Sequence, residues 1–179
     1  HLSTPHRARS ALYPALQFMN EISVLRTQAV DPFDTAIIDT GYFHCGTAEN
    51  IIPAEAEIVG NVRAYNDDLR VELKRRMENI ARGLELAFDV KCDYEHRFGY
   101  DSLINDPAMT DLAFNAARKV ADNALVMRTD RLQMGGEDFA EYTAHAKAAF
   151  CMLGGGGEAP QHSDHFVIDE SAFEIGVAL

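Results

Sequence analysis

The fold of the first half of the chain is decided by the stretch EAEIVGNVRAYNDDLRVELKRRMENIARGLELAF, residues 55–88. Its opening part alternates apolar and polar side chains and places Ala56, Ile58 and Val62 on one side, as in a half-buried strand. Asn66, followed by two aspartates, is a typical helix start. The apolar residues after it recur every three or four positions and form one helix face: Leu69, Leu73, Met77, Ile80, Ala81 and Leu84. We therefore expect a strand followed by a long amphipathic helix.

The sequence on either side extends this pattern. The first thirty residues predict a helix with Ser10 as its cap and Pro14 in its first turn. Its expected buried face consists of Leu12, Leu16, Met19, Ile22 and Leu25. Residues 35–43 and 87–96 predict two more strands. The order helix, strand, strand, helix, strand matches a ferredoxin-like βαββαβ fold that lacks its first strand, which would lie just before His1.

The second half of the chain follows a different pattern, and we expect a domain boundary near residues 99–105. Asp106 and Pro107 begin a predicted helix that ends near Val120. Further expected elements are a helix over 137–146, a strand buried on both faces over 148–153, and a last helix capped by Asp169. The sequence thus predicts a ferredoxin-like domain over 1–98 and, over 99–179, part of an α/β domain with a parallel sheet.

Composition excludes several classes of protein. The 16 basic and 28 acidic residues give 16 − 28 = −12, which argues against binding to nucleic acid. No apolar run approaches the ~20 residues of a membrane span. Three widely spaced cysteines favour a reducing, cytoplasmic location over a disulfide framework. Because the chain opens at His1 and stops inside a predicted helix, we expect a piece of a longer polypeptide.

Four groups of residues are candidates for chemistry. His162 and His165 flank a carboxylate on a loop and are candidate metal ligands, although an exposed polar loop is the simpler explanation for this segment alone. Gly135 and Gly136 would let a ligand approach the backbone, with Glu137 either at the site or capping a helix.

Asn50 and Arg63 form the third group. They lie 63 − 50 = 13 positions apart and together would hold a carboxylate, unless they are a turn asparagine and a surface arginine. His1, before the first helix, is the fourth candidate, as a polarising or proton-transferring group. The glycine run 154–157 lacks the GxGxxG spacing of a nucleotide site.

In this order, the segments HLSTPH (1–6), NIIP (50–53), GNVR (60–63), MGGEDF (134–139) and His162 closely resemble the metal-dependent amidohydrolases of the aminoacylase/hippurate-hydrolase family. The resemblance covers nearly the whole chain. It implies a catalytic α/β domain with two divalent metal ions, zinc or manganese, and a smaller ferredoxin-like lid through which the protein forms a homodimer. The implied substrate is a small N-acyl amino acid, whose amide bond is hydrolysed by metal-activated water.

The resemblance also implies roles for individual residues. His162 would be a metal ligand, and His1 would reach the partner subunit's active site and stabilise the oxyanion. The residues that would bind the substrate are Asn50, Arg63, Gly135, Gly136 and Glu137.

One departure from the family pattern limits these expectations. The remaining metal ligands and the general-base carboxylate belong to an upstream half that this sequence does not contain. We therefore expect these 179 residues alone to bind metal weakly and to hydrolyse nothing. Two alternatives remain open: a non-catalytic dimerisation or ligand-binding module, and a dipeptidase or carboxypeptidase of the same superfamily.

Overall fold

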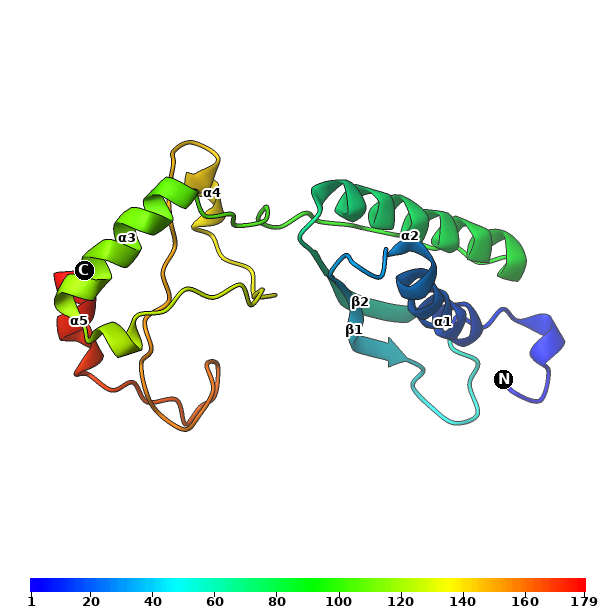
Figure 1. Ribbon diagram of the computed structural model, residues 1–179. Helices are drawn as coiled ribbons and strands as arrows, with labels where there is room; N and C mark the ends of the chain where they lie inside the picture. The colour runs from blue at the N-terminus through cyan, green and yellow to red at the C-terminus, as the bar shows by residue number, and fades with distance from the viewer. The chain divides into compact units, whose positions relative to one another are not determined.

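The computed structural model describes residues 1–179, whose contacts divide into two units, His1–Ser102 and Leu103–Leu179. In the first unit, two helices cover one face of a β-hairpin (Figure 1). The helices are α1 (Leu12–Ala29) and α2 (Asp67–Phe88), and the short 3-10 turn η1 (Pro5–Arg7) precedes them.

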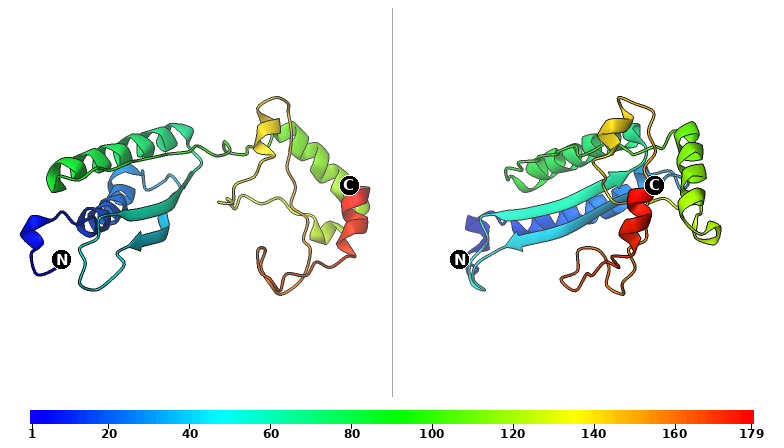
Figure 2. Two further views of the ribbon diagram at one scale, coloured as in Figure 1. Left: turned by 180° about the vertical axis from the view of Figure 1, so that it is seen from behind. Right: turned by 90° about the vertical axis from the view of Figure 1, so that its left-hand side faces the viewer.

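The hairpin consists of β1 (Ala36–Cys45) and β2 (Ala56–Ala64), which pair antiparallel. Figure 2 shows it as a long twisted ribbon in the view from the side. The register is interrupted by a bulge between Thr40 and Tyr42. Next to this bulge Gly60 lies so close to β1 that a Cβ atom there would be 2.5 Å from the carbonyl oxygen of Asp39. A side chain cannot be placed at that position without moving backbone, which explains the glycine.

Both helices form where the sequence predicts them. The Leu69 N–H donates to Asn66 Oδ1 (3.1 Å), so Asn66 caps α2 as predicted. The predicted cap of α1 is wrong: its N-cap residue is Ala11, and Ser10 Oγ only accepts the Leu12 N–H (3.3 Å) just before the helix. Asp89 ends α2 in the left-handed conformation with φ 51°.

The core of this unit lies between the helices and the hairpin. Leu73 is completely buried at its centre, surrounded by Ile22, Leu25, Ile38, Leu69 and Met77. The expected buried face of α1 is wrong at Leu16, which is 43% exposed, because Ala15 occupies the buried side of that turn instead.

The strand expected over 87–96 is not formed. Residues 87 and 88 complete α2, and the chain from residue 90 onward runs without a β-ladder. The reason is the lack of a neighbour: the sheet has two strands, so the segment has no paired backbone beside it. The predicted alternation is nevertheless present, because Cys92, Tyr94 and His96 are half-buried and the residues between them are exposed. The structure therefore shows a mixed α and β unit with a two-stranded sheet.

The second unit contains four short elements. These are α3 (Pro107–Val120), η2 (Asn123–Leu125), α4 (Ala140–Thr143) and α5 (Ala172–Ala178). Asp106 caps α3 as predicted, since the Met109 N–H donates to its Oδ1 at 3.0 Å. The helix expected over 137–146 is shorter, and Asp169 accepts the Ser171 N–H at 3.0 Å just before α5.

The strand expected over 148–153 is not formed either. The Asp106 N–H donates to the Ala148 carbonyl at 2.8 Å, but no ladder develops. Met152 is 71% exposed, so the expectation of burial on both faces is wrong for this chain. Only Ala140 and Ala172 are buried in the second unit, because no sheet is present for its apolar side chains to cover. None of the helices in either unit has the length and apolar character needed to cross a bilayer.

Candidate functional site

His1 is exposed, and its ring is held by Ser3. The Ser3 backbone N–H donates to His1 Nδ1 at 3.1 Å, and Ser3 Oγ lies 2.7 Å from the same nitrogen. Because a backbone N–H can only donate, Nδ1 acts as the acceptor, and the neutral ring then carries its proton on Nε2. This arrangement presents a single N–H donor to an incoming ligand. The sequence reasoning missed Ser3, although its position two residues after His1 was a visible signal.

The segment that carries His1 lies against the loop between β1 and β2. The Leu2 N–H donates to the Asn50 carbonyl at 3.1 Å, and the Ala11 N–H donates to the Pro53 carbonyl at 3.0 Å. The chain's N-terminus and this loop are at the same end of the hairpin in both Figure 1 and Figure 2. The hydrogen bond of Leu2 therefore places Asn50 beside the residue that follows His1 in the chain.

Arg63 lies near the other end of the hairpin. It is opposite Ile37 in the register and is exposed, as expected for a residue on the sheet face away from the helices. Between Ala56, where β2 starts beside the loop, and Arg63 there are 63 − 56 = 7 residue steps. At about 3.3 Å per step this is on the order of 20 Å. Within one copy of this unit, Asn50 and Arg63 therefore do not meet at one carboxylate.

The glycine pair at 135–136 precedes the α4 turn in the second unit. A Cβ at Gly135 would have open space around it, so the backbone there is accessible. Glu137 is half-buried, and its Oε1 accepts the Phe139 N–H at 3.1 Å. This contact lies one residue before the first residue of α4, and Phe139, the N-cap residue of α4, makes no side-chain cap.

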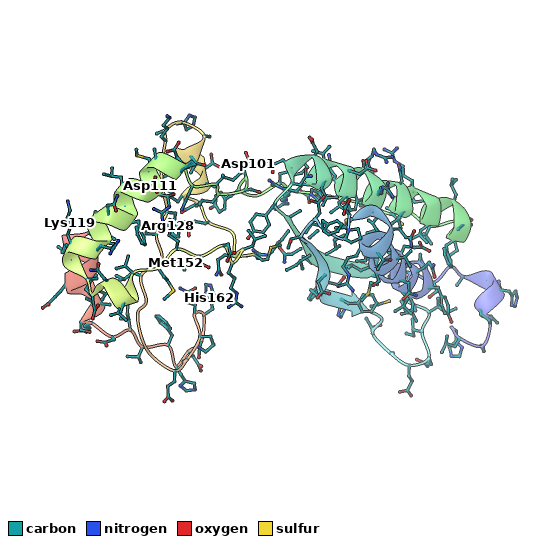
Figure 3. The ribbon with its side chains drawn as sticks, viewed as in Figure 1. Asp101, Asp111, Lys119, Arg128, Met152 and His162 are labelled. Atoms are coloured by element: carbon teal, nitrogen blue, oxygen red, sulfur yellow. The ribbon has the colours of Figure 1, made fainter.

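His162 lies on a loop whose two arms are joined at the base. The Asp169 N–H donates to the Gly155 carbonyl at 2.6 Å. A Cβ at Gly157, which has φ +83°, would be 2.6 Å from the Val167 carbonyl oxygen. His162 itself has φ 67°, a left-handed conformation that is uncommon for a residue with a side chain. Figure 3 labels His162 on this loop, where its ring is exposed to solvent.

The donors near His162 do not form a complete metal site. Asp164 and His165 are close to each other, with 3.6 Å between Oδ1 and Nε2. No group of three or more histidine, cysteine, aspartate or glutamate side chains in the chain is arranged to hold a metal ion. Even a catalytic zinc ion takes about three protein ligands, a number that the side chains around His162 do not supply.

The groups with the clearest pKa shifts lie away from these residues. Burial raises the pKa of Tyr94 to about 12, and burial together with Lys74 and Arg70 lowers the pKa of His96. Both rings are therefore neutral at pH 7. They pack in a row of aromatic rings, with Phe18 6.4 Å from Tyr94 and Phe98 4.8 Å from His96 between centroids. Their shifts reflect packing against the helices.

Known proteins of similar sequence are hydrolases. N-acetyl-L-cysteine deacetylase from Bacillus subtilis is 30% identical over 172 residues, which are 96% of this chain and 41% of that protein. Thermostable carboxypeptidase 1 from Saccharolobus solfataricus is 28% identical over 182 residues, covering 98% of this chain and 45% of that protein. The chain thus spans less than half the length of these relatives.

A solved structure and a family model agree with these relatives. The Bacillus subtilis protein YXEP, a dinuclear metal-binding peptidase of the M20 family, aligns with a TM-score of 0.68 and 26% identity, over 95% of this chain and 43% of that one. The model of peptidase family M20/M25/M40 matches residues 14–179. The predicted resemblance to metal-dependent amidohydrolases and peptidases is confirmed: the chain belongs to peptidase family M20/M25/M40.

Proposed function

We propose that these residues form part of a metal-dependent hydrolase that cleaves the amide bond of N-acyl amino acids. The observation that carries this proposal is the family match over residues 14–179, together with a relative that is named for removing an acetyl group from an amino acid. The relative named as a carboxypeptidase supports a second candidate, cleavage of a peptide bond next to a terminal amino acid. Both reactions need a group that polarises an amide carbonyl and a group that binds a carboxylate.

The first proposed group is His1. With Nδ1 occupied by the Ser3 N–H, the ring offers its Nε2 proton to the carbonyl oxygen of the scissile amide. The negative charge that develops on this oxygen strengthens the hydrogen bond in the transition state. Removal of such a donor typically costs about 3–4 kcal/mol of transition-state stabilisation.

The second proposed group is Arg63, whose guanidinium would bind the substrate's carboxylate in a bidentate manner. Asn50 would contact the amino-acid part of the substrate from the loop that holds the His1 segment. Because Asn50 and Arg63 lie at opposite ends of the hairpin, we place them in two different active sites of a homodimer. Each site would take Arg63 from one protomer, with His1 and Asn50 of the partner.

We further propose that residues 1–98 are a ferredoxin-like lid and that residues 99–179 belong to the catalytic domain. Two observations support the lid. One edge of β2 has no partner, and the alternately buried segment around Tyr94 packs against the same core without a ladder. In a βαββαβ sheet the first strand lies between the third and the fourth. A strand preceding His1 would therefore pair with β2 on one side and with residues 90–98 on the other.

The remaining predicted residues would line the site in the catalytic domain. We propose His162 as one metal ligand and Gly135, Gly136 and Glu137 as part of the wall around the substrate. No three donor side chains of this chain are clustered to hold a metal ion, and in this proposal the further ligands come from outside these 179 residues.

The experiment uses the full-length protein that contains this chain. We expect release of the amino acid from N-acetyl amino acids, little cleavage of dipeptides, and loss of activity after chelation. His1→Ala should lower kcat far more than it lowers metal content, while His145→Ala, an exposed histidine without an assigned role, serves as the control. Faster cleavage of dipeptides would favour the carboxypeptidase candidate, and no hydrolysis of either substrate would refute the proposal.

A second experiment tests the shared site. Mixed dimers of His1→Ala and His162→Ala protomers should recover part of the activity, because one of their two sites then has both histidines. Absence of recovery in verified mixed dimers would refute the arrangement across two protomers. The 179-residue chain alone is expected to bind less than stoichiometric metal and to show no turnover.

A further inference from the structure

The sheet face of the first unit that points away from the helices carries a row of exposed side chains. On the other face Ile38 is buried in the core and Val62 packs against it, so their neighbours in each strand point away from the helices. The exposed side chains form cross-strand pairs: Ile37 with Arg63, Asp39 with Asn61, Tyr42 with Val59, and His44 with Glu57. We call these residues the open face.

One end of the open face combines a positive charge with an apolar side chain. Ile37 lies directly opposite Arg63 in the register and is 40% exposed. Side chains directly opposite each other in an antiparallel pair have Cβ atoms about 4.5–5.5 Å apart. Arg63 is the only arginine or lysine on the open face. A ligand held by its guanidinium therefore lies within reach of the isoleucine side chain.

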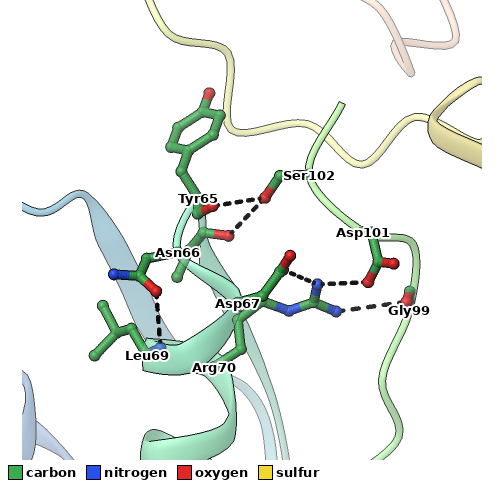
Figure 4. Close-up of polar contacts among 9 residues, drawn as sticks. Tyr65, Asn66, Asp67, Leu69, Arg70, Gly99, Asp101 and Ser102 are labelled. Atoms are coloured by element: carbon green, nitrogen blue, oxygen red, sulfur yellow. Dashed lines mark hydrogen bonds and ion pairs between the residues drawn. The ribbon is translucent and has the colours of Figure 1, made fainter. Parts of the chain in front are cut away.

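Both strands are fixed in place at this end of the hairpin. Just beyond β2, Ser102 Oγ donates to the Tyr65 carbonyl at 2.9 Å, and Asn66 caps the helix that follows (Figure 4). Before β1, the Phe33 N–H donates to Asp31 Oδ1 at 2.9 Å and closes the turn that leads into the strand. A site whose backbone is already ordered loses little freedom when a ligand binds. The cross-strand pair between these two anchors is thus preorganised.

We propose that Ile37 selects the amino-acid part of the substrate and favours long apolar side chains, such as those of leucine and methionine. This inference rests on the proposed function, in which Arg63 binds the substrate's carboxylate. The carboxylate and the side chain of an amino acid are attached to the same carbon atom, so the side chain starts beside the guanidinium. A side chain of three or more carbons then covers the exposed part of Ile37. Each methylene group buried in this way strengthens binding about fourfold.

The charge next to this pair acts against acidic substrates. Asp39 follows two positions after Ile37 on the open face, and its Oδ1 accepts the Thr40 N–H at 2.8 Å, which fixes the carboxylate on the strand. A second carboxylate on the substrate would approach this negative charge and would lose water against the isoleucine side chain. The open face therefore disfavours acyl derivatives of aspartate and glutamate.

Steady-state kinetics of the full-length protein that contains this chain test the inference. The value of kcat/KM is measured for the N-acetyl derivatives of leucine, alanine and glutamate. We expect the leucine derivative to exceed the alanine derivative about tenfold, with the glutamate derivative the poorest of the three. Ile37→Thr keeps a β-branched residue in the strand and removes most of the apolar surface. It should reduce the ratio of leucine to alanine to about twofold, mainly through KM.

A gain of function and a matched control separate selection from general damage. Ile37→Lys should raise kcat/KM for the glutamate derivative about tenfold, because its ammonium group then faces the second carboxylate. Val59→Thr is the control, since Val59 is 51% exposed on the same face and lies on the order of 13 Å from Arg63 along β2. Its substrate ratios should equal those of the unchanged protein.

The possible outcomes distinguish this inference from the proposed function. Unchanged substrate ratios in both Ile37 variants, or an equal shift in Val59→Thr, would overturn the selection by Ile37 while hydrolysis itself stands. If none of the three substrates is hydrolysed by the unchanged protein, the proposed function is refuted and this inference with it. Circular dichroism of each variant verifies that it is folded.

Discussion

Gly60 offers a sharp test of the packing in the first unit, because the space for a side chain there is occupied by backbone. A Cβ at this position would lie 2.5 Å from the Asp39 carbonyl oxygen, whereas ordinary contacts begin at 3.4 Å. Relief requires a displacement of 3.4 − 2.5 = 0.9 Å between two paired strands. The carbonyl belongs to β1 and cannot rotate away as a side chain would.

The expected effect of Gly60→Ala follows from two opposing contributions. Overpacking of this kind costs about 2–3 kcal/mol, toward the upper end of the usual range. Loss of glycine's freedom in the unfolded chain offsets about 0.5–1 kcal/mol of that. The net loss of about 1–2.5 kcal/mol should lower Tm by roughly 5–15 °C for a unit of this size.

Gly83 provides the matched control. It is exposed within α2, and a Cβ there would meet nothing within 4 Å. Gly83→Ala should therefore raise the stability by about 0.5–1 kcal/mol through helix propensity.

The two variants are compared in the full chain. Urea and thermal unfolding are followed by far-ultraviolet circular dichroism and by the amide NMR signals of β1 and β2. The same chemical substitution should change stability in opposite directions at the two positions. If the Gly60→Ala and Gly83→Ala variants have the same free energy of unfolding, the close contact between β1 and β2 at the bulge is refuted.

Two further predictions concern α2. Leu73→Ala, at the fully buried centre of the core, should lower the free energy of unfolding by about 2–5 kcal/mol. Leu86→Ala, on the same helix but 88% exposed, should change it by less than about 0.5 kcal/mol, and equal urea midpoints for the two would contradict the assigned core. Hydrogen bonds from Arg75 and Arg76 lower the pKa of Glu72 from 4.5 to about 2, so the folded state binds this proton less readily than the unfolded state. The ionised Glu72 therefore stabilises the folded state. This stabilisation is fully present above about pH 4.5 and is lost as the pH falls toward 2. Glu72→Gln should flatten the pH dependence of the urea midpoint in that window, and an unchanged slope would refute the assignment.

Several predictions about the site depend on distances between residues in the folded chain, which the pattern of neighbouring residues in the sequence does not specify. The sequence places Asn50 and Arg63 close in chain order, and a joint carboxylate site was a reasonable hypothesis. The extended strand β2 lies between them and places Arg63 on the order of 20 Å from Ala56, where the loop that holds Asn50 ends, because a strand advances about 3.3 Å per residue. Conversely, the bond from the Leu2 N–H to the Asn50 carbonyl brings together segments far apart in the sequence.

What the sequence determined by itself is local. The alternation over 55–65, the Asn66 cap and the apolar stripe from Leu69 to Leu84 each depend on neighbours within four positions, and all three are present in the structure. The tertiary structure alone decided whether residues 87–96 and 148–153 become strands, because a strand needs hydrogen bonds from a second stretch of backbone. It also decided that Gly60 has no room for a side chain and that Ala15, not Leu16, faces the core. These properties arise from contacts between distant segments, which periodicity within one segment cannot specify.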